Sequence, residues 1–221
     1  MAVNNMKQNH TDITIVLDRS GSMASVADDT IGGFNRFLDD QRTTPGTAAI
    51  TLHQFDDQFE TPIHAQDVKA APQLTSKTFV PRGNTALLDA IGRAIGDTGA
   101  RMEAAGENER AEKVVFVIIT DGHENASHEY NHGKVFEMIE HQRSKYAWEF
   151  VFLGANQDAI KVASNLGMSA GNAINYAANA IGTKKAFAAT SANLRSFRSG
   201  RSASMAYSKA DRDEQSKAGA A

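Results

Sequence analysis

DITIVLDRSGS, residues 12–22, is the stretch that decides the fold of this 221-residue chain. Residues 13–17 are a β-branched and apolar run, which is typical of a strand, and the run stops abruptly at Asp18. The residues from Arg19 to Ser22 are polar and include a glycine, as in a loop. Apolar residues then recur at spacings of four, three and four from position 27 to position 38. The segment therefore predicts a strand, a loop and an amphipathic helix in that order.

The same alternation continues along the chain. Further strands are expected over residues 48–55, 58–64, 114–119, 148–153 and 173–176, of which the first two form a hairpin around Asp56-Asp57. Helices are expected over residues 85–102, 133–146, 158–166 and 183–197. Residues 114–119 are apolar on both faces, as in a parallel strand covered by helices on both sides. We therefore expect a three-layer, doubly wound, Rossmann-like α/β fold, with a mostly parallel sheet, one antiparallel edge strand and helices on both faces.

The chain divides into one domain and two polar ends. We expect a flexible N-terminal arm over residues 1–10, a single domain over 11–199 and a flexible polar tail over 200–221. The tail is rich in Ser, Ala, Lys and Asp, and has almost no large apolar residue with which to bury surface.

The composition excludes several classes of protein. Hydrophobic residues make up 41% and charged residues 22% of the chain, an ordinary globular balance. The net charge of -3 gives no reason to expect a nucleic acid or an anionic membrane as a partner. Cysteine is absent, which excludes disulfides, thiolate zinc sites and cysteine nucleophiles. No segment approaches the roughly 18 apolar residues of a membrane span, and the first residues lack the apolar core of a signal peptide. We therefore expect a cytoplasmic protein.

Three short polar segments stand where strands or loops lead into helices. They are Asp18-x-Ser20-x-Ser22, Gly83-Asn84-Thr85 and Thr120-Asp121-Gly122. Ligands of open α/β sheets settle beyond the carboxyl ends of the strands, and two of these segments directly follow apolar strands. We therefore expect all three segments to converge at one edge of the sheet.

The side chains that would converge offer oxygen atoms only. They are the two carboxylates and three hydroxyls of Asp18, Ser20, Ser22, Thr85 and Asp121. Oxygen ligands suit hard cations, and a set with only two carboxylates fits Mg²⁺ best, with Mn²⁺ or Ca²⁺ as substitutes. The alternate spacing of the first three residues places them on one side of an extended loop, while Arg19 points elsewhere.

These three segments, in this order and strand context, closely resemble the metal-ion-dependent adhesion site of von Willebrand factor A-type (vWA) domains. The resemblance covers roughly residues 10–199. In its compact build the chain is similar to intracellular bacterial or phage members of the family. The resemblance implies that the two serines and the threonine approach the metal directly or nearly so, and that the two aspartates act directly or through water. It further implies an open metal position, which a Glu or Asp of a partner protein fills, and a protein-binding rather than a catalytic role.

Other interpretations stay open for the same residues. Asp18 to Ser22 and Thr85 are also typical of helix caps, and Asp121-Gly122 is typical of a turn. An aspartate at a strand end also serves as the nucleophile of some Mg²⁺-dependent phosphoryl hydrolases, although these usually carry a second aspartate where this chain has Ser20. A third alternative is an assembly or scaffold protein with a vestigial metal site.

Several charged or ionisable residues outside the five have a plainer interpretation. We expect the three histidines at 123, 128 and 132 to be surface residues, and Asp56, Asp57 and Glu124 to be solvated loop carboxylates. The basic residues near the end of the domain are expected to form a solvated helix face: Lys184, Lys185, Arg195, Arg198 and Arg201.

Overall fold

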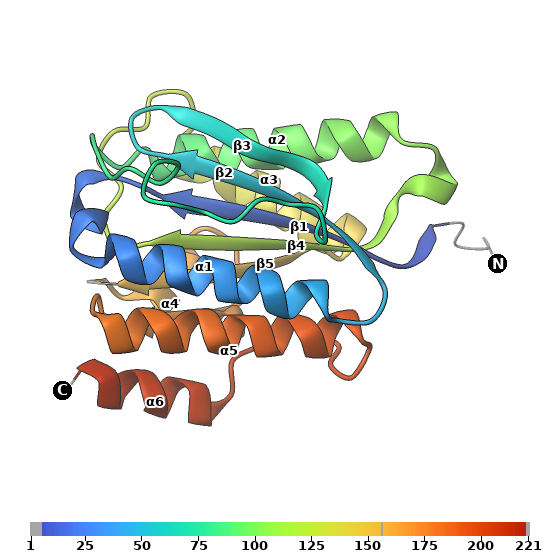
Figure 1. Cartoon of the computed structure of the whole chain (residues 1–221). Coiled ribbons are helices and arrows are strands. Elements are labelled where there is room, and N and C mark those ends of the chain that lie inside the picture. The colour runs from blue at the N-terminus through green and yellow to red at the C-terminus, as the bar shows by residue number, and fades with distance from the viewer. Residues whose placement is uncertain (1–5, 156, 220–221) are drawn as a thin grey trace.

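A six-stranded sheet forms the middle of the protein in the computed structural model, which describes residues 6–155 and 157–219 (Figure 1). The strands lie in the order β3-β2-β1-β4-β5-β6. Their bounds are β1 Lys7–Asp18, β2 Thr47–Phe55, β3 Phe59–Asp67, β4 Ala111–Thr120, β5 Glu149–Ala155 and β6 Ala173–Tyr176.

The sheet is parallel except at one edge. β1 pairs in parallel with both β2 and β4, and β5 pairs in parallel with β4 and β6. β3 pairs antiparallel with β2, as a hairpin requires. The predicted sheet, with one antiparallel edge strand, is therefore confirmed.

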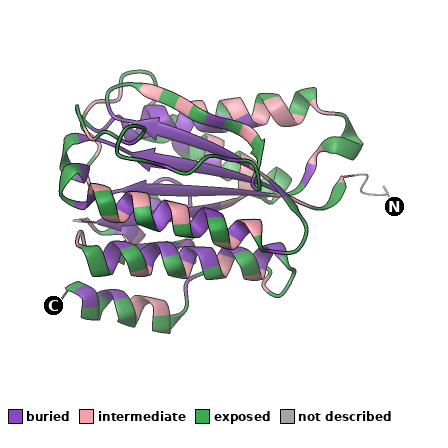
Figure 2. Ribbon diagram, viewed as in Figure 1, coloured by how far each residue is buried: buried purple, intermediate pink, exposed green. Residues whose placement is uncertain are grey.

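Helices cover both faces of the sheet (Figure 1). α1 (Ala27–Arg42) and α5 (Ala180–Arg198) pack on one face, and α2 (Leu87–Ala104), α3 (His132–Tyr146) and α4 (Ala159–Asn165) pack on the other. Each face has its own apolar core, so the strands are buried from both sides (Figure 2). The three-layer α/β fold expected from the sequence is confirmed.

A close helix contact explains why α1 has a glycine at position 33. α1 buries Phe34 and Leu38 against the sheet. A Cβ atom at Gly33 would lie only 2.3 Å from the ring of Phe187 in α5. Glycine at this position therefore lets α1 and α5 approach each other closely, although it lowers the helix propensity of α1.

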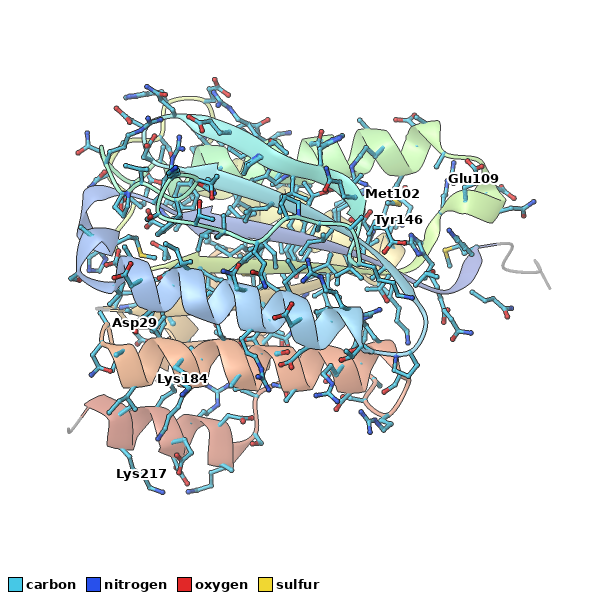
Figure 3. All side chains as sticks on the ribbon, viewed as in Figure 1. Asp29, Met102, Glu109, Tyr146, Lys184 and Lys217 are labelled. Atoms are coloured by element: carbon cyan, nitrogen blue, oxygen red, sulfur yellow. The ribbon has the colours of Figure 1, made fainter. Side chains whose placement is uncertain are left out.

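The C-terminal residues differ from the expected flexible tail. Met205 is fully buried, and the Tyr207 hydroxyl lies 2.7 Å from the hydroxyl of Thr190 in α5. A further helix, α6 (Lys209–Gly219), packs along α5. The expectation of a tail without packed structure is therefore wrong for residues 200–219, because Met205 and Tyr207 are buried and Arg212 in α6 donates hydrogen bonds to the carbonyls of Gly171 and Ala173. Charged residues such as Lys184 and Lys217 lie on these outer helices (Figure 3).

The N-terminal arm also differs from the expectation. β1 begins at Lys7, so residues 7–10 belong to the sheet rather than to an arm. The Lys7 amide donates a hydrogen bond to the Arg110 carbonyl at 2.9 Å, next to the start of β4. Residues 1–5 of the predicted arm lie outside the described residues.

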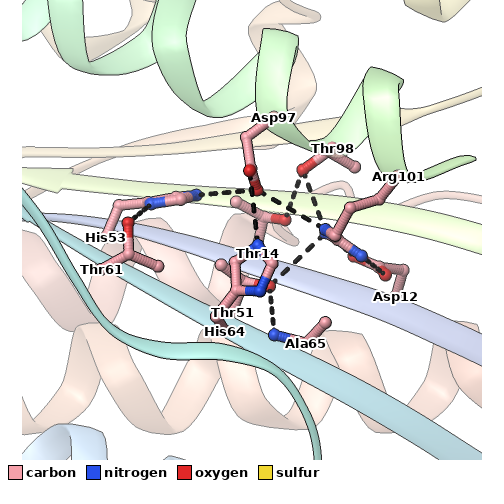
Figure 4. A network of polar contacts seen from close by, with 10 residues as sticks. All are labelled: Asp12, Thr14, Thr51, His53, Thr61, His64, Ala65, Asp97, Thr98 and Arg101. Carbon is pink, nitrogen blue, oxygen red and sulfur yellow. Dashed lines mark hydrogen bonds and ion pairs between the residues drawn. The ribbon is translucent and has the colours of Figure 1, made fainter.

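A polar network lies between α2 and the sheet (Figure 4). Arg101 forms an ion pair with the buried carboxylate of Asp12 in β1 at 2.8 Å. The buried ring of His53 in β2 bonds the Thr61 hydroxyl of β3 through Nδ1 at 2.8 Å. Polar contacts of Asp97 and Arg101 thus connect α2 to β1, β2 and β3.

Within the described residues, no helix has the length and apolar character needed to cross a membrane.

Candidate metal centre

Asp18 ends β1 and is fully buried. Its Oδ1 accepts a hydrogen bond from the Ser20 amide, and its Oδ2 accepts one from the Thr120 hydroxyl, both at 2.6 Å. Burial raises the pKa of this carboxyl to about 6, although the hydrogen bonds from Thr120 and Ser20 oppose the shift. A nearby cation would favour the ionised form of such a carboxyl.

The two serines stand side by side at the turn into a short 3-10 helix, Gly21–Val26. The Ser20 and Ser22 hydroxyl oxygens are 3.1 Å apart. Ser20 is buried, whereas Ser22 is exposed and donates a hydrogen bond to Asp121 Oδ1 at 2.6 Å. This bond joins the loop after β1 to the loop after β4.

Thr85 is buried between these two loops. A Cβ atom at Gly122 would lie 3.0 Å from the Thr85 hydroxyl oxygen and 3.4 Å from that of Ser22. The Thr85 backbone pairs with Asn125: its amide donates to the Asn125 side chain at 2.9 Å, and its carbonyl accepts from the Asn125 amide at 3.0 Å. Because Gly122 has no side chain, the hydroxyls of Thr85 and Ser22 can both lie close to it.

Asp121 completes the group from the end of β4. Only 3% of this residue is exposed, and burial raises the pKa of its carboxyl, while the Ser22 hydrogen bond opposes the shift. Two buried carboxylates with raised pKa values at one place favour a positively charged ligand.

The spacing of the oxygens fits a small hard cation. Adjacent ligands of an octahedral Mg²⁺ lie about 3 Å apart, since each is about 2.1 Å from the metal. The contacts of Ser22 with Ser20 at 3.1 Å and with Asp121 at 2.6 Å are close to this separation. No group of three or more His, Cys, Asp or Glu side chains in the described part of the chain could hold a metal ion. A metal at this edge of the sheet would therefore depend on the hydroxyl groups.

The structure thus brings together all five residues that the sequence singled out. Ser20 and Thr85 do not act as simple helix caps in the structure. Ser20 precedes the 3-10 helix without a side-chain capping bond, and α2 begins at Leu87, after Ala86 rather than at Thr85. The partners of Asp18 and Thr85, which are Thr120 and Asn125, were not predicted from the sequence, although a hydroxyl at the end of an otherwise apolar strand is a usable signal.

Three predictions about surrounding charges are wrong. Asp56 is completely buried, because Arg19 and Arg82 form ion pairs with its carboxylate. Glu124 is partly buried and accepts a hydrogen bond from the Leu88 amide at the start of α2. Arg198 is buried rather than solvated: it donates to the Gln41 carbonyl at 2.8 Å, and burial lowers its pKa to about 10.

The expected surface histidines are on the surface. His123, His128 and His132 are all exposed.

The site can now be set beside known proteins. The model of the von Willebrand factor type A domain family matches residues 12–211. The chain belongs to this family. The match includes β1 from residue 12 onward, the other five strands and the three polar segments of this vWA domain. No curated protein matches the sequence.

Several solved structures are similar to this vWA domain. The vWF domain of the type V pili tip protein Mfa5 from Porphyromonas gingivalis is 10% identical, with a TM-score of 0.60, and the match covers 83% of this chain and 94% of that one. Proximal thread matrix protein 1 from the mussel byssus, in a structure with a zinc occupied MIDAS motif, is 17% identical, with a TM-score of 0.58 and coverage of 84% and 46%.

A third similar structure is the manganese-loaded TRAP protein of Plasmodium vivax. It is 16% identical, with a TM-score of 0.51 and coverage of 69% and 58%. The vWA domain thus spans less than half of the mussel protein and more than half of the Plasmodium protein. At these identities the similarity establishes the fold.

Proposed function

We propose that this vWA domain binds one Mg²⁺ through Asp18, Ser20, Ser22, Thr85 and Asp121, and that it uses the metal to bind a Glu or Asp side chain of a partner protein. The observation that carries the proposal is the convergence of three neutral hydroxyls and two buried carboxylates at one edge of the sheet. Mn²⁺ and Ca²⁺ are the expected substitutes, since both accept oxygen ligands.

Each side chain has a distinct part in the proposed site. The hydroxyls of Ser20, Ser22 and Thr85 offer uncharged oxygens, and Asp18 and Asp121 balance the two positive charges of the ion. A bound Mg²⁺ would supply an electrophilic centre that accepts a carboxylate oxygen from the partner. Ser22 is exposed while the other four are buried, which favours approach of the partner over the loop that carries Ser22.

The environment of Asp18 disfavours a hydrolase. A nucleophilic carboxylate must reach its substrate, whereas Asp18 is fully buried and both of its oxygens accept short hydrogen bonds. We therefore propose a binding module without catalytic activity. We further propose a cytoplasmic protein, and the net charge of -3 favours partners other than nucleic acids and anionic membranes.

Calorimetric titration tests the metal part of the proposal. We expect saturable binding of one Mg²⁺ per chain, and its loss in Asp18→Ala and Ser22→Ala. Ser25→Ala, a neighbouring exposed hydroxyl that contacts the carbonyl of Ser22, is the matched control and should bind as the wild type does. A wild-type protein that binds no Mg²⁺, Mn²⁺ or Ca²⁺ at millimolar concentration would instead support a scaffold with a vestigial site.

Affinity capture tests the partner part. Proteins retained by the wild-type domain in Mg²⁺ are eluted with chelator, identified and purified, and each of their acidic residues is then changed to its amide. We expect one Glu→Gln or Asp→Asn change to abolish binding. Binding that persists in chelator contradicts the proposal.

A further inference from the structure

The β2–β3 hairpin supports two of the three segments of the metal site. The Arg19 amide, in the loop after β1, donates to the Phe55 carbonyl at 2.8 Å. The Ala86 amide, next to Thr85, donates to the Asp56 carbonyl at 3.0 Å. Ser20 and Thr85 thus each lie one residue from a backbone contact with the same hairpin turn.

Gly83 makes the contact with the turn especially close. Its φ angle is +67°, a left-handed conformation that favours glycine, and a Cβ atom there would lie 2.5 Å from Asp57 Oδ1. The Gly83 carbonyl also accepts the Gly21 amide at 3.1 Å. The segment that carries Thr85 therefore lies between the hairpin and the serine loop, and it touches both.

Two arginines and two carboxylates join these parts through their side chains. The Arg19 side chain, only 5% exposed, forms ion pairs with Asp56 at 3.2 Å and with Glu60 at 2.7 Å. A second nitrogen of Arg19 donates to the other Glu60 oxygen at 2.8 Å, so Glu60 holds the guanidinium with both oxygens. Asp56 lies at the end of the hairpin and Glu60 lies in β3.

Arg82 binds the same two carboxylates from the other side. It contacts Asp56 at 2.8 Å and Glu60 at 2.9 Å, and its amide donates to the Arg19 carbonyl at 2.8 Å. The two arginines hold the pKa of Glu60 at about 2, with the Arg19 hydrogen bond as the largest cause. Two positive and two negative charges thus neutralise one another.

The neutralisation of Arg19 bears on the metal site, because Arg19 stands between two of the proposed metal-binding residues, Asp18 and Ser20. An unpaired guanidinium in that loop would repel a cation and could turn toward the Asp18 carboxylate. Its pairing with Glu60 keeps the positive charge on the hairpin side and fixes the backbone from which Ser20 projects.

We propose that Glu60 and Arg82 are positioning residues for the metal site, which act through Arg19 to hold the serine loop and the Thr85 segment at a fixed separation. The inference rests on the proposed metal binding. Removing a group bonded directly to a metal ligand typically changes metal affinity by about 10-fold to 100-fold, and Glu60 acts one residue further away, so the low end of this range applies. The hairpin would thus be coupled to the metal, and the coupling acts in both directions.

The variant that tests this is Glu60→Gln, and Glu214→Gln is its matched control. Both glutamates are about half exposed, at 52% and 48%, and each pairs with two cations. Glu214 lies in α6 and pairs with Lys185 and Lys217, away from the three polar segments. We expect Glu60→Gln to weaken Mg²⁺ binding at least about 10-fold by calorimetry, and Glu214→Gln to stay within about twofold of the wild type.

Hydrogen exchange measured in chelator tests the positioning without metal. In Glu60→Gln we expect faster exchange at the amides of Arg19, Gly21 and Ala86, and wild-type exchange at these amides in Glu214→Gln. Unchanged exchange there, or equal Mg²⁺ affinity in the two variants, overturns the inference. A wild-type protein without Mg²⁺ binding overturns the proposed function instead, and the exchange result then still decides whether Glu60 positions the loops.

Discussion

Acid should destabilise this domain through one buried histidine, His53. Its ring is 1% exposed, stacks on Phe59 with centroids 4.8 Å apart and bonds the Thr61 hydroxyl through Nδ1 (Figure 4). Burial is the main cause that lowers the pKa of His53 from 6.5 to about 4, while Asp97, 4.0 Å from Nε2, opposes the shift. Arg101 adds to the lowering as a neighbouring positive charge.

The sign of the effect follows from where the proton binds more tightly. Between pH 6.5 and pH 4 the unfolded chain binds the proton and the folded protein does not, so stability rises with pH in this window. The contribution of His53 is complete above pH 6.5 and is lost as the pH falls toward 4. A pKa difference of about 2.5 corresponds to about 3 kcal/mol, of which about 2 kcal/mol is lost by pH 5.

Urea unfolding at pH 7.5 and pH 5, in wild type and in His53→Gln, measures this loss. The glutamine does not titrate. Between these pH values the free energy of unfolding of the variant should therefore fall by about 2 kcal/mol less than that of the wild type, whatever the stability of the variant at pH 7.5. His64→Gln is the control, because His64 contacts the same Asp97 but is 52% exposed; it should lose nearly as much as the wild type. Equal losses in wild type and His53→Gln would refute the reasoning.

Two further substitutions test other contacts. Thr120→Val keeps the shape of the side chain but removes the hydroxyl that donates to the buried Asp18 carboxylate. We expect the free energy of unfolding, measured with urea in the presence of chelator, to fall by about 2 kcal/mol. A decrease of less than about 0.5 kcal/mol contradicts this prediction. Asn131→Ala removes the side chain that accepts the Lys134 amide at the start of α3, which should cost about 1 kcal/mol, or about 3 °C in a thermal melt. Asn131→Asp keeps the acceptor and should melt with the wild type; a melting point as low as that of Asn131→Ala would show that the cap does not act as described.

Much of the fold was predictable because its signals are local. The apolar run that became β4 reads as a strand buried on both faces, and the spacing from position 27 to 38 reads as the helix that became α1. The segment after residue 200 has no such signal. Its packing depends on the burial of Met205 in the core and on the contact of Tyr207 with Thr190 of α5, and a contact between distant residues leaves no periodic pattern in the sequence.

The five oxygen-bearing residues were predictable for a related reason, since each stands beside a strand end or a helix start. Their partners were not. Asp56 lies in a turn sequence that is normally solvated, and it is buried here only because Arg19 and Arg82 arrive from two other segments. Such pairing depends on how the loops are placed around the sheet, which composition and spacing do not reveal.

The strand order explains why the site forms between β1 and β4. From β1 the chain passes through α1 on one face to reach β2, whereas from β4 it passes through α3 on the other face to reach β5. The loops leaving β1 and β4 therefore diverge toward opposite faces, and a crevice opens between them at the carboxyl ends of the strands. Asp18 and Asp121 stand at those two strand ends, and the Ser22 hydroxyl spans the crevice to Asp121. The β2–β3 hairpin lies next to β1 on the side away from β4, and its turn contacts the serine loop and the Thr85 segment. Asp121 is instead held by β4, and it follows that changes in the hairpin should move the hydroxyls of Ser20, Ser22 and Thr85 relative to the carboxylates of Asp18 and Asp121.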